Sequence, residues 1–182
     1  MAEKNKYGKA LHAIMAATDN LEIERKFRVV GEFKHLAIDC THIQQGYISS
    51  GNGRTVRVRI RDDKGYLTIK GPSGAAGLSR FEWEREISLS EAQDLMNICE
   101  PGIIDKHRYL VPNTDGVHVW EIDVFHGDND GLIMAEVELE SENAPFDKPD
   151  FIGREVTGNR RYYNSHMRKF PYKMWDDDEA KE

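Results

Sequence analysis

The segment 22–27, which reads Glu-Ile-Glu-Arg-Lys-Phe, constrains the fold most, because charged residues occupy every second position, and Ile23 and Phe27 stand at the positions between and after them. In a β-strand, every second side chain lies on the same face. Glu22, Glu24 and Lys26 therefore share one face of a predicted strand, and the apolar side chains share the other. A solvated surface strand would explain this segment alone, so its meaning depends on whether other strands repeat the pattern.

The same alternation recurs in most of the strands that we predict between residues 21 and 141. The predicted strands cover residues 21–30, 43–50, 55–62, 65–71, 80–89, 106–112, 117–126 and 132–141. The charged residues that alternate with apolar neighbours are Arg57, Arg59, Arg61, Lys70, Arg80, Glu82, Glu84, Glu86, Lys106, Arg108, Glu121, Asp123, Glu136, Glu138 and Glu140. About eight largely antiparallel strands predict a mainly β fold, a closed eight-stranded barrel, because closure leaves no exposed edge.

The remaining segments predict turns, a few covering helices and two tails. Hairpin turns are expected at residues 51–53, 62–65 and 113–116, which are rich in Gly, Asn and Asp. Helices are expected at residues 90–98, 32–37 and 159–169. We expect one domain over residues 21–175, preceded by a tail or short helix (1–20) and followed by an acidic tail (176–182).

Composition excludes several classes of protein. The 182 residues suit one domain, and a net charge of −7 gives no argument for a nucleic-acid partner. No apolar run approaches the roughly 20 residues of a membrane span. The two cysteines, Cys40 and Cys99, have no metal-ligand spacing, which favours a reducing, cytoplasmic location. A homodimer is the default expectation for the oligomeric state.

The alternation alone leaves two orientations of the charged faces open. In the first, apolar side chains fill a small barrel and an unusually charged surface faces water. In the second, charged side chains line a wet interior, and helices and loops cover the apolar outer face. Buried charges are costly unless they are paired, hydrated or bound to ions. The second orientation therefore implies a charged ligand.

A resemblance to a known family favours the second orientation. Residues 22–26 match a Glu-x-Glu-x-Lys signature, and further matches follow in order at residues 45–47, 56–59, 67–71, 82–84, 106–109, 120–125, 135–139 and 153–157. Over residues 21–165 the chain resembles the CYTH superfamily, the triphosphate tunnel metalloenzymes, and within it the short bacterial inorganic tripolyphosphatases. The resemblance implies an eight-stranded antiparallel barrel lined by charges, a triphosphate substrate and a divalent metal, Mg²⁺ or Mn²⁺.

Site roles follow from this resemblance together with side-chain chemistry. A triphosphate requires a row of cations, and divalent metals such as Mg²⁺ require oxygen ligands. The expected substrate-binding residues are Lys26, Arg57, Arg59, Lys70, Lys106 and Arg108. The expected metal ligands are Glu22, Glu24, Glu121, Asp123, Glu136 and Glu138. The expected catalytic residues are Lys26, Tyr47, Glu82 and Glu84.

The expected reaction is metal-dependent hydrolysis of tripolyphosphate to pyrophosphate and phosphate. Three alternatives stay open: a class IV adenylyl cyclase, a thiamine or nucleoside triphosphatase, and a polyphosphate-binding module without activity. The role of Lys26 as base, phosphate ligand or carboxylate partner is also open, because neighbouring carboxylates and cations shift its pKa in opposite directions. Asn159 stands where the family usually has an acidic residue, so a contact at the tunnel mouth is in doubt.

Overall fold

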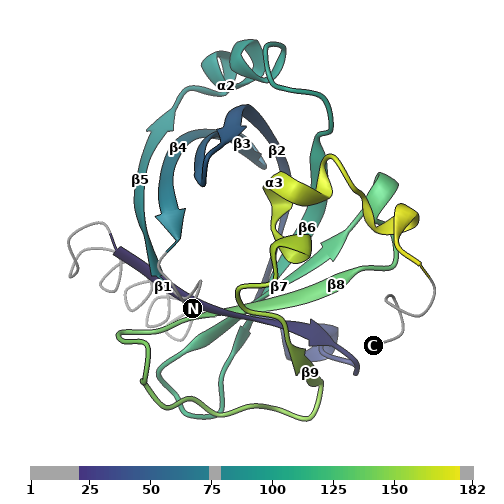
Figure 1. The fold of residues 1–182 in the computed structure, drawn as a ribbon. Coiled ribbons are helices and arrows are strands. Elements are labelled where there is room, and N and C mark those ends of the chain that lie inside the picture. The colour runs from purple at the N-terminus through teal and green to yellow at the C-terminus, as the bar shows by residue number, and fades with distance from the viewer. Residues whose placement is uncertain (1–20, 74–78, 177–182) are drawn as a thin grey trace.

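The computed structural model describes residues 21–73 and 79–176, and within them the chain forms one antiparallel sheet of nine strands (Figure 1). The strands are β1 (Leu21–Val29), β2 (Asp39–Gly51), β3 (Arg54–Arg61), β4 (Lys64–Ser73), β5 (Ser79–Ile87), β6 (Ile104–Pro112), β7 (Val119–Phe125), β8 (Ile133–Glu138) and β9 (Ile152–Glu155). The eight predicted strands are all present. The tail predicted at 1–20 and, apart from residue 176, the acidic tail predicted at 176–182 lie outside the described residues.

The sheet closes into a barrel through β1. The strand order is β5-β4-β3-β2-β6-β7-β8-β1-β9, and β1 also pairs with β5, which joins the two ends of the eight-stranded series. One edge of β1 pairs with β8 over residues 24–28. The other edge pairs first with β5, over residues 21–23, and then with β9. The predicted eight-stranded barrel is confirmed, and β9 is an additional strand that the sequence did not predict.

Helices are short, and the longest of those described covers the outside of the barrel. It is α2 (Leu89–Met96), which begins with a capping box: the Ser88 hydroxyl accepts from the backbone N–H of Glu91, and the Glu91 carboxylate accepts from that of Ser88. Ala92 of α2 is buried, close to Gly65 of β4. The other helical segments are η1 (Lys34–Leu36), η2 (Gly127–Asn129), η3 (Arg160–Tyr162), α3 (Asn164–Met167) and η4 (Tyr172–Met174).

Two predicted helices differ in extent from the observed ones. The segment predicted as a helix at residues 159–169 is split into η3 and α3, and the segment at 32–37 forms only the 3₁₀ turn η1. Asn159 accounts for the start of η3, because its side-chain oxygen accepts from the backbone N–H of Arg161 at 3.1 Å. No helix among residues 21–73 and 79–176 has the length and apolar character needed to cross a membrane.

The main hydrophobic core lies outside the barrel wall, not within it. Phe27, Trp120 and Val137 of β1, β7 and β8 are at most 2% exposed. Phe146 covers them from the connection between β8 and β9, with its ring centroid 6.0 Å from that of Phe27. Phe33, in the segment before β2, packs against the same cluster. Covering segments therefore bury the apolar face of the strands, which leaves the charged face directed inward.

A second apolar cluster lies where the C-terminal segment meets the barrel. It consists of Ile104, Phe125, Leu132, Met134, Val156, Tyr162 and Met167. Ile104, Phe125 and Met134 continue the inward-facing parity of Lys106, Asp123 and Glu136 on β6, β7 and β8. The inward-facing row thus changes from charged to apolar at this end, where Met167 of α3 packs.

Candidate active site

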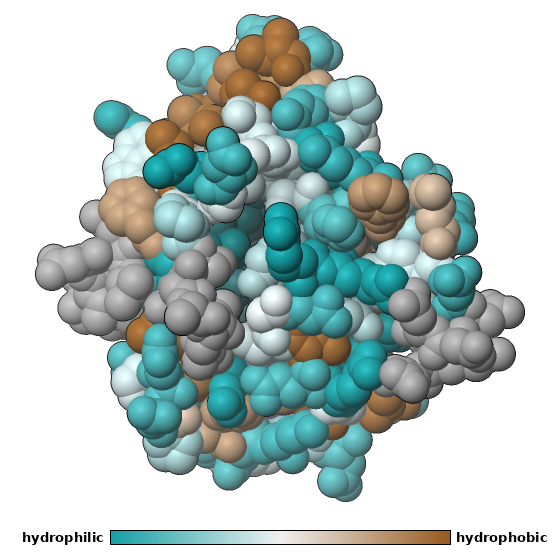
Figure 2. All heavy atoms as spheres, in the orientation of Figure 1, coloured by the Kyte–Doolittle hydropathy of each residue, from teal (hydrophilic) through white to brown (hydrophobic). Residues whose placement is uncertain are grey.

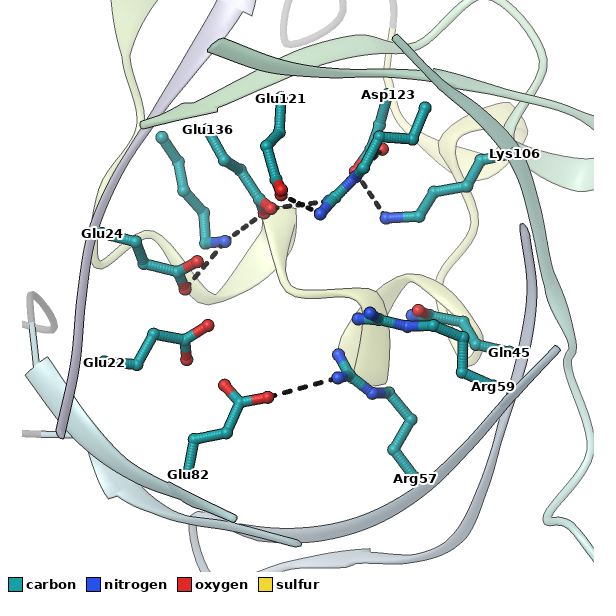
Figure 3. Close-up of polar contacts among 12 residues, drawn as sticks. Glu22, Glu24, Gln45, Arg57, Arg59, Glu82, Lys106, Glu121, Asp123 and Glu136 are labelled. Atoms are coloured by element: carbon teal, nitrogen blue, oxygen red, sulfur yellow. Dashed lines mark hydrogen bonds and ion pairs between the residues drawn. The ribbon is translucent and has the colours of Figure 1, made fainter. Parts of the chain in front are cut away.

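Charged side chains from opposite walls of the barrel point toward one another in its interior, which we call the tunnel (Figure 3). Lys106 and Asp123 are each 1% exposed, and Arg57 is 5% exposed. The tunnel residues are Glu22, Glu24 and Lys26 of β1, Gln45 and Tyr47 of β2, Arg57 and Arg59 of β3, Thr68 and Lys70 of β4, Arg80, Glu82 and Glu84 of β5, Lys106 and Arg108 of β6, Glu121 and Asp123 of β7, and Glu136 and Glu138 of β8. The inward orientation of the charged faces is thus established.

One ion-pair network joins β6, β7 and β8. Arg108 makes a two-pronged contact with Asp123, from Nε to Oδ1 and from Nη2 to Oδ2, both at 2.7 Å. It also pairs with Glu121, and with Glu136 at 2.8 Å. The ammonium of Lys106 lies 2.5 Å from Asp123. Forked contacts of this kind fix a guanidinium in place, so Arg108 holds the three carboxylates together.

A second network joins β1, β4 and β5. Lys70 pairs with Glu22 at 2.9 Å and with Glu82 at 2.5 Å. Arg80 donates to Glu22 at 2.9 Å and to Glu24 at 3.0 Å. Arg80 was not among the expected site residues, because the β1–β5 pairing that places it beside Glu22 is a tertiary contact.

Lys26 connects the two networks. Its ammonium lies 2.9 Å from Glu24 and also pairs with Glu136. Burial alone would lower the pKa of Lys26, but Glu136 and Glu24 outweigh burial and raise it well above the ordinary value. Lys26 therefore carries a firm positive charge in this arrangement, which fits a phosphate ligand or carboxylate partner better than a base.

The arginines of β3 face the carboxylates from the opposite side. Arg57 donates to Thr68 at 3.0 Å and to Glu84 at 3.1 Å, and Thr68 donates to Glu84 at 2.6 Å. Arg59 is less compensated: its nearest carboxylate contact is Glu84 at 4.0 Å, and its buried Nε has no hydrogen-bond partner among the described residues. Burial and the adjacent Arg57 lower the pKa of Arg59 to about 10. An anion is the natural partner for such a group.

Glu138 is the least compensated carboxylate. It makes no hydrogen bond or ion pair with any residue in the described part of the chain. Burial, followed by the charges of Glu121, Glu22 and Glu24, raises the pKa of Glu138 to about 8. Burial likewise raises the pKa of Glu82 to about 7, with Lys70 opposing the shift and Glu22 adding to it. These values indicate an excess of negative charge near Glu138.

The carboxylates around Glu138 suit a divalent cation, because such ions bind oxygen ligands and would neutralise charges that repel one another. As the side chains stand, no three or more His, Cys, Asp or Glu residues within 21–73 and 79–176 are arranged to hold a metal ion. Several of the expected ligands instead contact lysine or arginine, as Asp123 and Glu136 do. Metal binding therefore requires some carboxylates to leave their ion pairs.

Gln45 and Thr68 are tunnel residues that the sequence analysis did not select. Gln45 is fully buried and donates to the Tyr47 hydroxyl at 3.2 Å, while its carbonyl oxygen has no partner among the described residues. Burial raises the pKa of Tyr47, so its phenol stays protonated. Strand parity was the available signal, because Gln45 shares a strand face with Tyr47, and Thr68 shares one with Lys70.

A small cavity of about 40 Å³ opens beside these groups. Its lining residues are Lys26, Tyr47, Thr55, Arg57, Lys70, Arg80, Tyr163, Asn164 and Ser165. Figure 2 shows a hollow at the centre of this face, surrounded mainly by hydrophilic residues. The contribution of residues 163–165 depends on tertiary packing and has no signal in the local sequence.

Other residues of the alternating pattern lie outside the tunnel. Glu86 pairs at the surface with Lys64 at 3.3 Å. Trp120 is fully buried in the outer core and Trp83 is 37% exposed, so both lie on the outer face. His118 is buried between the carboxylates of Asp115 at 2.7 Å and Glu140 at 3.3 Å.

Comparison with known proteins gives a consistent result. The CYTH domain family profile matches residues 20–171. An inorganic triphosphatase of Acetivibrio thermocellus is 50% identical over 154 residues, which is 84% of this chain and 96% of that protein. An inorganic triphosphatase of Nitrosomonas europaea is 34% identical over 149 residues, 80% of this chain and 95% of that protein.

Solved structures agree on the fold. The crystal structure of an inorganic triphosphatase aligns with a TM-score of 0.57 and 30% identity, over 81% of this chain and 93% of its own. A Pyrococcus horikoshii protein aligns with a TM-score of 0.53 and 20% identity, over 67% of this chain and 80% of its own, which supports the fold alone. With the profile match over most of its length and a relative that is half identical, the chain belongs to the CYTH domain family.

Proposed function

We propose that this protein is a metal-dependent inorganic triphosphatase, which hydrolyses tripolyphosphate to pyrophosphate and phosphate. The observation that carries the proposal is the set of buried cations inside the closed barrel. Lys26, Arg57, Lys70, Lys106 and Arg108 are buried, and Arg59 and Arg80 are partly buried. The inorganic triphosphatases that are 50% and 34% identical to this chain support the choice of substrate.

Substrate binding exchanges partners within the tunnel. A triphosphate brings several negative charges, and each guanidinium or ammonium that turns to it leaves a carboxylate behind. Removing one partner of a buried ion pair costs about 3–5 kcal/mol when the other is left uncompensated. Arg59 avoids most of this cost, because its nearest carboxylate is 4.0 Å away and its Nε has no partner among the described residues. Arg59 therefore makes the first strong contact with the substrate.

The carboxylates left behind would hold the metal. Glu22, Glu24, Glu121, Asp123, Glu136 and Glu138 are the proposed ligands of Mg²⁺ or Mn²⁺. Glu138 leads this group, because it has no hydrogen bond or ion pair within the described residues, and burial, followed by the neighbouring carboxylates, raises its pKa to about 8. A bound divalent ion supplies positive charge beside the phosphoryl oxygens.

The chain's own residues then position and deprotonate the attacking water. Glu82 is the proposed acceptor of the water proton, since its pKa of about 7 suits proton transfer near neutral pH. The water oxygen attacks the terminal phosphorus, the bond from that phosphorus to the bridging oxygen breaks, and pyrophosphate leaves. Glu84 is held by Arg57 and Thr68 and acts as a positioning residue. Lys26 stabilises negative charge, and Tyr47 contributes a hydrogen-bond donor.

The proposal is tested by supplying the purified protein with tripolyphosphate, ATP or thiamine triphosphate. Each substrate is combined with Mg²⁺, Mn²⁺ or EDTA, and phosphate, pyrophosphate and cyclic AMP are measured. Tripolyphosphate hydrolysis that depends on a divalent ion is the expected result. Phosphate release from ATP alone, or formation of cyclic AMP, contradicts the proposal. Tight binding of tripolyphosphate without turnover under any condition would point to a binding module instead.

A further inference from the structure

The C-terminal segment forms part of the cavity wall. Tyr163, Asn164 and Ser165 line the cavity, whereas its other lining residues belong to β1–β5. The side-chain oxygen of Asn164 is buried and has no hydrogen-bond partner among the described residues. In Figure 1, α3 lies in front of the barrel interior on this side. Anything that fixes α3 therefore also fixes one boundary of the substrate cavity.

Arg168, directly after α3, anchors this segment to the barrel. Its side chain is only 3% exposed. The guanidinium donates to the Ser50 hydroxyl at 2.6 Å and to the backbone carbonyl of Pro101 at 2.9 Å, and it pairs with Glu100. Ser50 also donates to Glu100 at 2.8 Å, so the three side chains form a closed cluster.

The anchor is joined to the tunnel wall and has a close backbone contact. The backbone N–H of Glu100 donates to the carbonyl of Tyr47 at 2.7 Å, and Tyr47 lines the cavity. Gly102 has φ of +94°, and a Cβ there would lie 2.3 Å from the backbone oxygen of Arg168. Glycine at 102 thus permits both the left-handed backbone and the approach of Arg168.

We infer that Arg168 is a positioning residue for substrate selection. Through its contacts with Ser50, Glu100 and Pro101, it holds Tyr163–Ser165 across the cavity. The site then admits a triphosphate with two free ends and disfavours one whose end carries a nucleoside. The inference deepens the proposed function and rests on it for the identity of the substrate. The role of Arg168 is independent of the metal ligands and of the proton transfer.

The test measures binding rather than turnover. The dissociation constants of tripolyphosphate and ATP are determined by calorimetry in EDTA for the wild-type protein, Arg168→Ala, Arg168→Lys and Lys169→Ala. Arg168→Ala should improve ATP binding relative to tripolyphosphate by about tenfold, the scale at which pocket shape discriminates between ligands. Arg168→Lys should give an intermediate ratio of the two dissociation constants. Lysine keeps a positive charge beside Glu100 but loses the guanidinium contacts with Ser50 and Pro101. Lys169→Ala alters the exposed neighbour and should leave the ratio unchanged.

Gly102→Ala provides an independent route, because it displaces the Arg168 backbone without changing any charge. It should move the ratio in the same direction, and trypsin should cleave both variants faster at Arg160 or Arg161. An unchanged ratio in Arg168→Ala and Gly102→Ala overturns the inference, as does an equal loss of affinity for both ligands. A protein that binds tripolyphosphate selectively but never hydrolyses it contradicts the proposed function and leaves the inference standing.

Discussion

At the scale of single residues, the acidic side chains of the tunnel differ in how completely their charge is compensated. Asp123 faces two cations, and although burial would raise its pKa, Arg108 and Lys106 outweigh burial and lower it. Glu138 faces other carboxylates, and its pKa is raised to about 8. The charge of Asp123 is thus compensated by neighbouring cations. The charge of Glu138 is repelled by neighbouring carboxylates, and a divalent cation would relieve that repulsion. We therefore expect mutations at Asp123 and Glu138 to have different consequences.

Glu24→Gln should reduce tripolyphosphate hydrolysis by about 100-fold while the barrel stays folded. Glutamine keeps the shape of the side chain but withdraws the carboxylate that faces Lys26 at 2.9 Å and Arg80 at 3.0 Å. The measurements are kcat and KM together with far-UV circular dichroism. Glu86→Gln is the matched control, because Glu86 lies at the surface with Lys64. Activity close to wild type in Glu24→Gln would remove Glu24 from the site.

Glu138 should make the metal-free protein less stable as pH rises. Its pKa in the folded state, about 8, lies above the ordinary value of 4.5, so the folded state binds the proton more tightly than the unfolded state. The resulting stabilisation is complete below about pH 4.5 and is lost as pH rises through about 8. The slope from one proton is at most about 1.4 kcal/mol per pH unit.

Urea unfolding of the wild-type protein and Glu138→Gln, at several pH values in EDTA, checks this expectation. The difference between their free energies of unfolding should change across that interval, and Glu86→Gln should follow the wild type. Adding Mg²⁺ or Mn²⁺ should stabilise the wild type more at pH 8 than at pH 6, because protons compete for the same oxygens. A pH-independent difference would show that Glu138 is not the titrating group.

At the scale of elements, three strands meet at a histidine cluster on the outer wall. His42 of β2 pairs in register with His107 of β6, and their ring centroids are 4.9 Å apart. His107 shares a hydrogen bond of 2.7 Å with His126, directly after β7. Asp105 lies 3.0 Å from His42. A hydrogen bond between two imidazoles requires one of them to be neutral, so the cluster joins these elements best above the ordinary histidine pKa.

Acid should therefore weaken the wall formed by β2, β6 and β7. Burial, and then the charges of His126 and His42, lower the pKa of His107 below its ordinary value of 6.5. Its contribution to stability is present above about pH 6.5 and is lost as pH falls through the folded-state pKa. His107→Gln should reduce the loss of stability on acidification, measured by the thermal midpoint. His35→Gln, at an exposed position, should behave like the wild type. Identical pH profiles for all three proteins would refute the coupling.

Prediction from sequence succeeded for elements with strong alternation and failed where tertiary contacts decide. The strands containing Arg57 and Arg59, or Glu136 and Glu138, alternate over enough residues to identify both the strand and its charged face. The four residues of β9, Ile152–Glu155, give no such pattern and depend on the free edge of β1. The resemblance to a family gave the inward orientation, which periodicity left open.

At the scale of the whole molecule, a chain with net charge −7 gathers five buried cations in one enclosed space: Lys26, Arg57, Lys70, Lys106 and Arg108. Low polarisability inside the barrel strengthens each interaction there, while the negative surface repels anions at long range. Selective binding of an anion therefore depends on the tunnel, not on the protein's overall charge. We therefore expect a polyanion to stabilise the folded protein only if it can enter the tunnel.

Tripolyphosphate should raise the thermal midpoint of the protein in EDTA. At a ligand concentration of 100 times the dissociation constant, binding should raise the free energy of unfolding by about 2.7 kcal/mol. Sulfate at equal ionic strength is the control, since it matches general salt effects but cannot span the tunnel. Arg59→Met should shrink the tripolyphosphate shift, because Arg59 is the cation with the weakest internal pairing. Equal shifts for the two anions would contradict a specific site.

The pairing of β1 has a consequence for biosynthesis. β1 begins the described chain, yet its partners over residues 24–29 are β8 and β9, which lie near the other end of the domain. A growing chain therefore cannot close the barrel until β8, residues 133–138, has left the ribosome, and Lys26 stays without Glu136 until then. In a chain truncated before Ile133, the amides of residues 24–28 should lose the protection from exchange that pairing with β8 provides. The charged lining of the tunnel is therefore complete only after β8 has been synthesised.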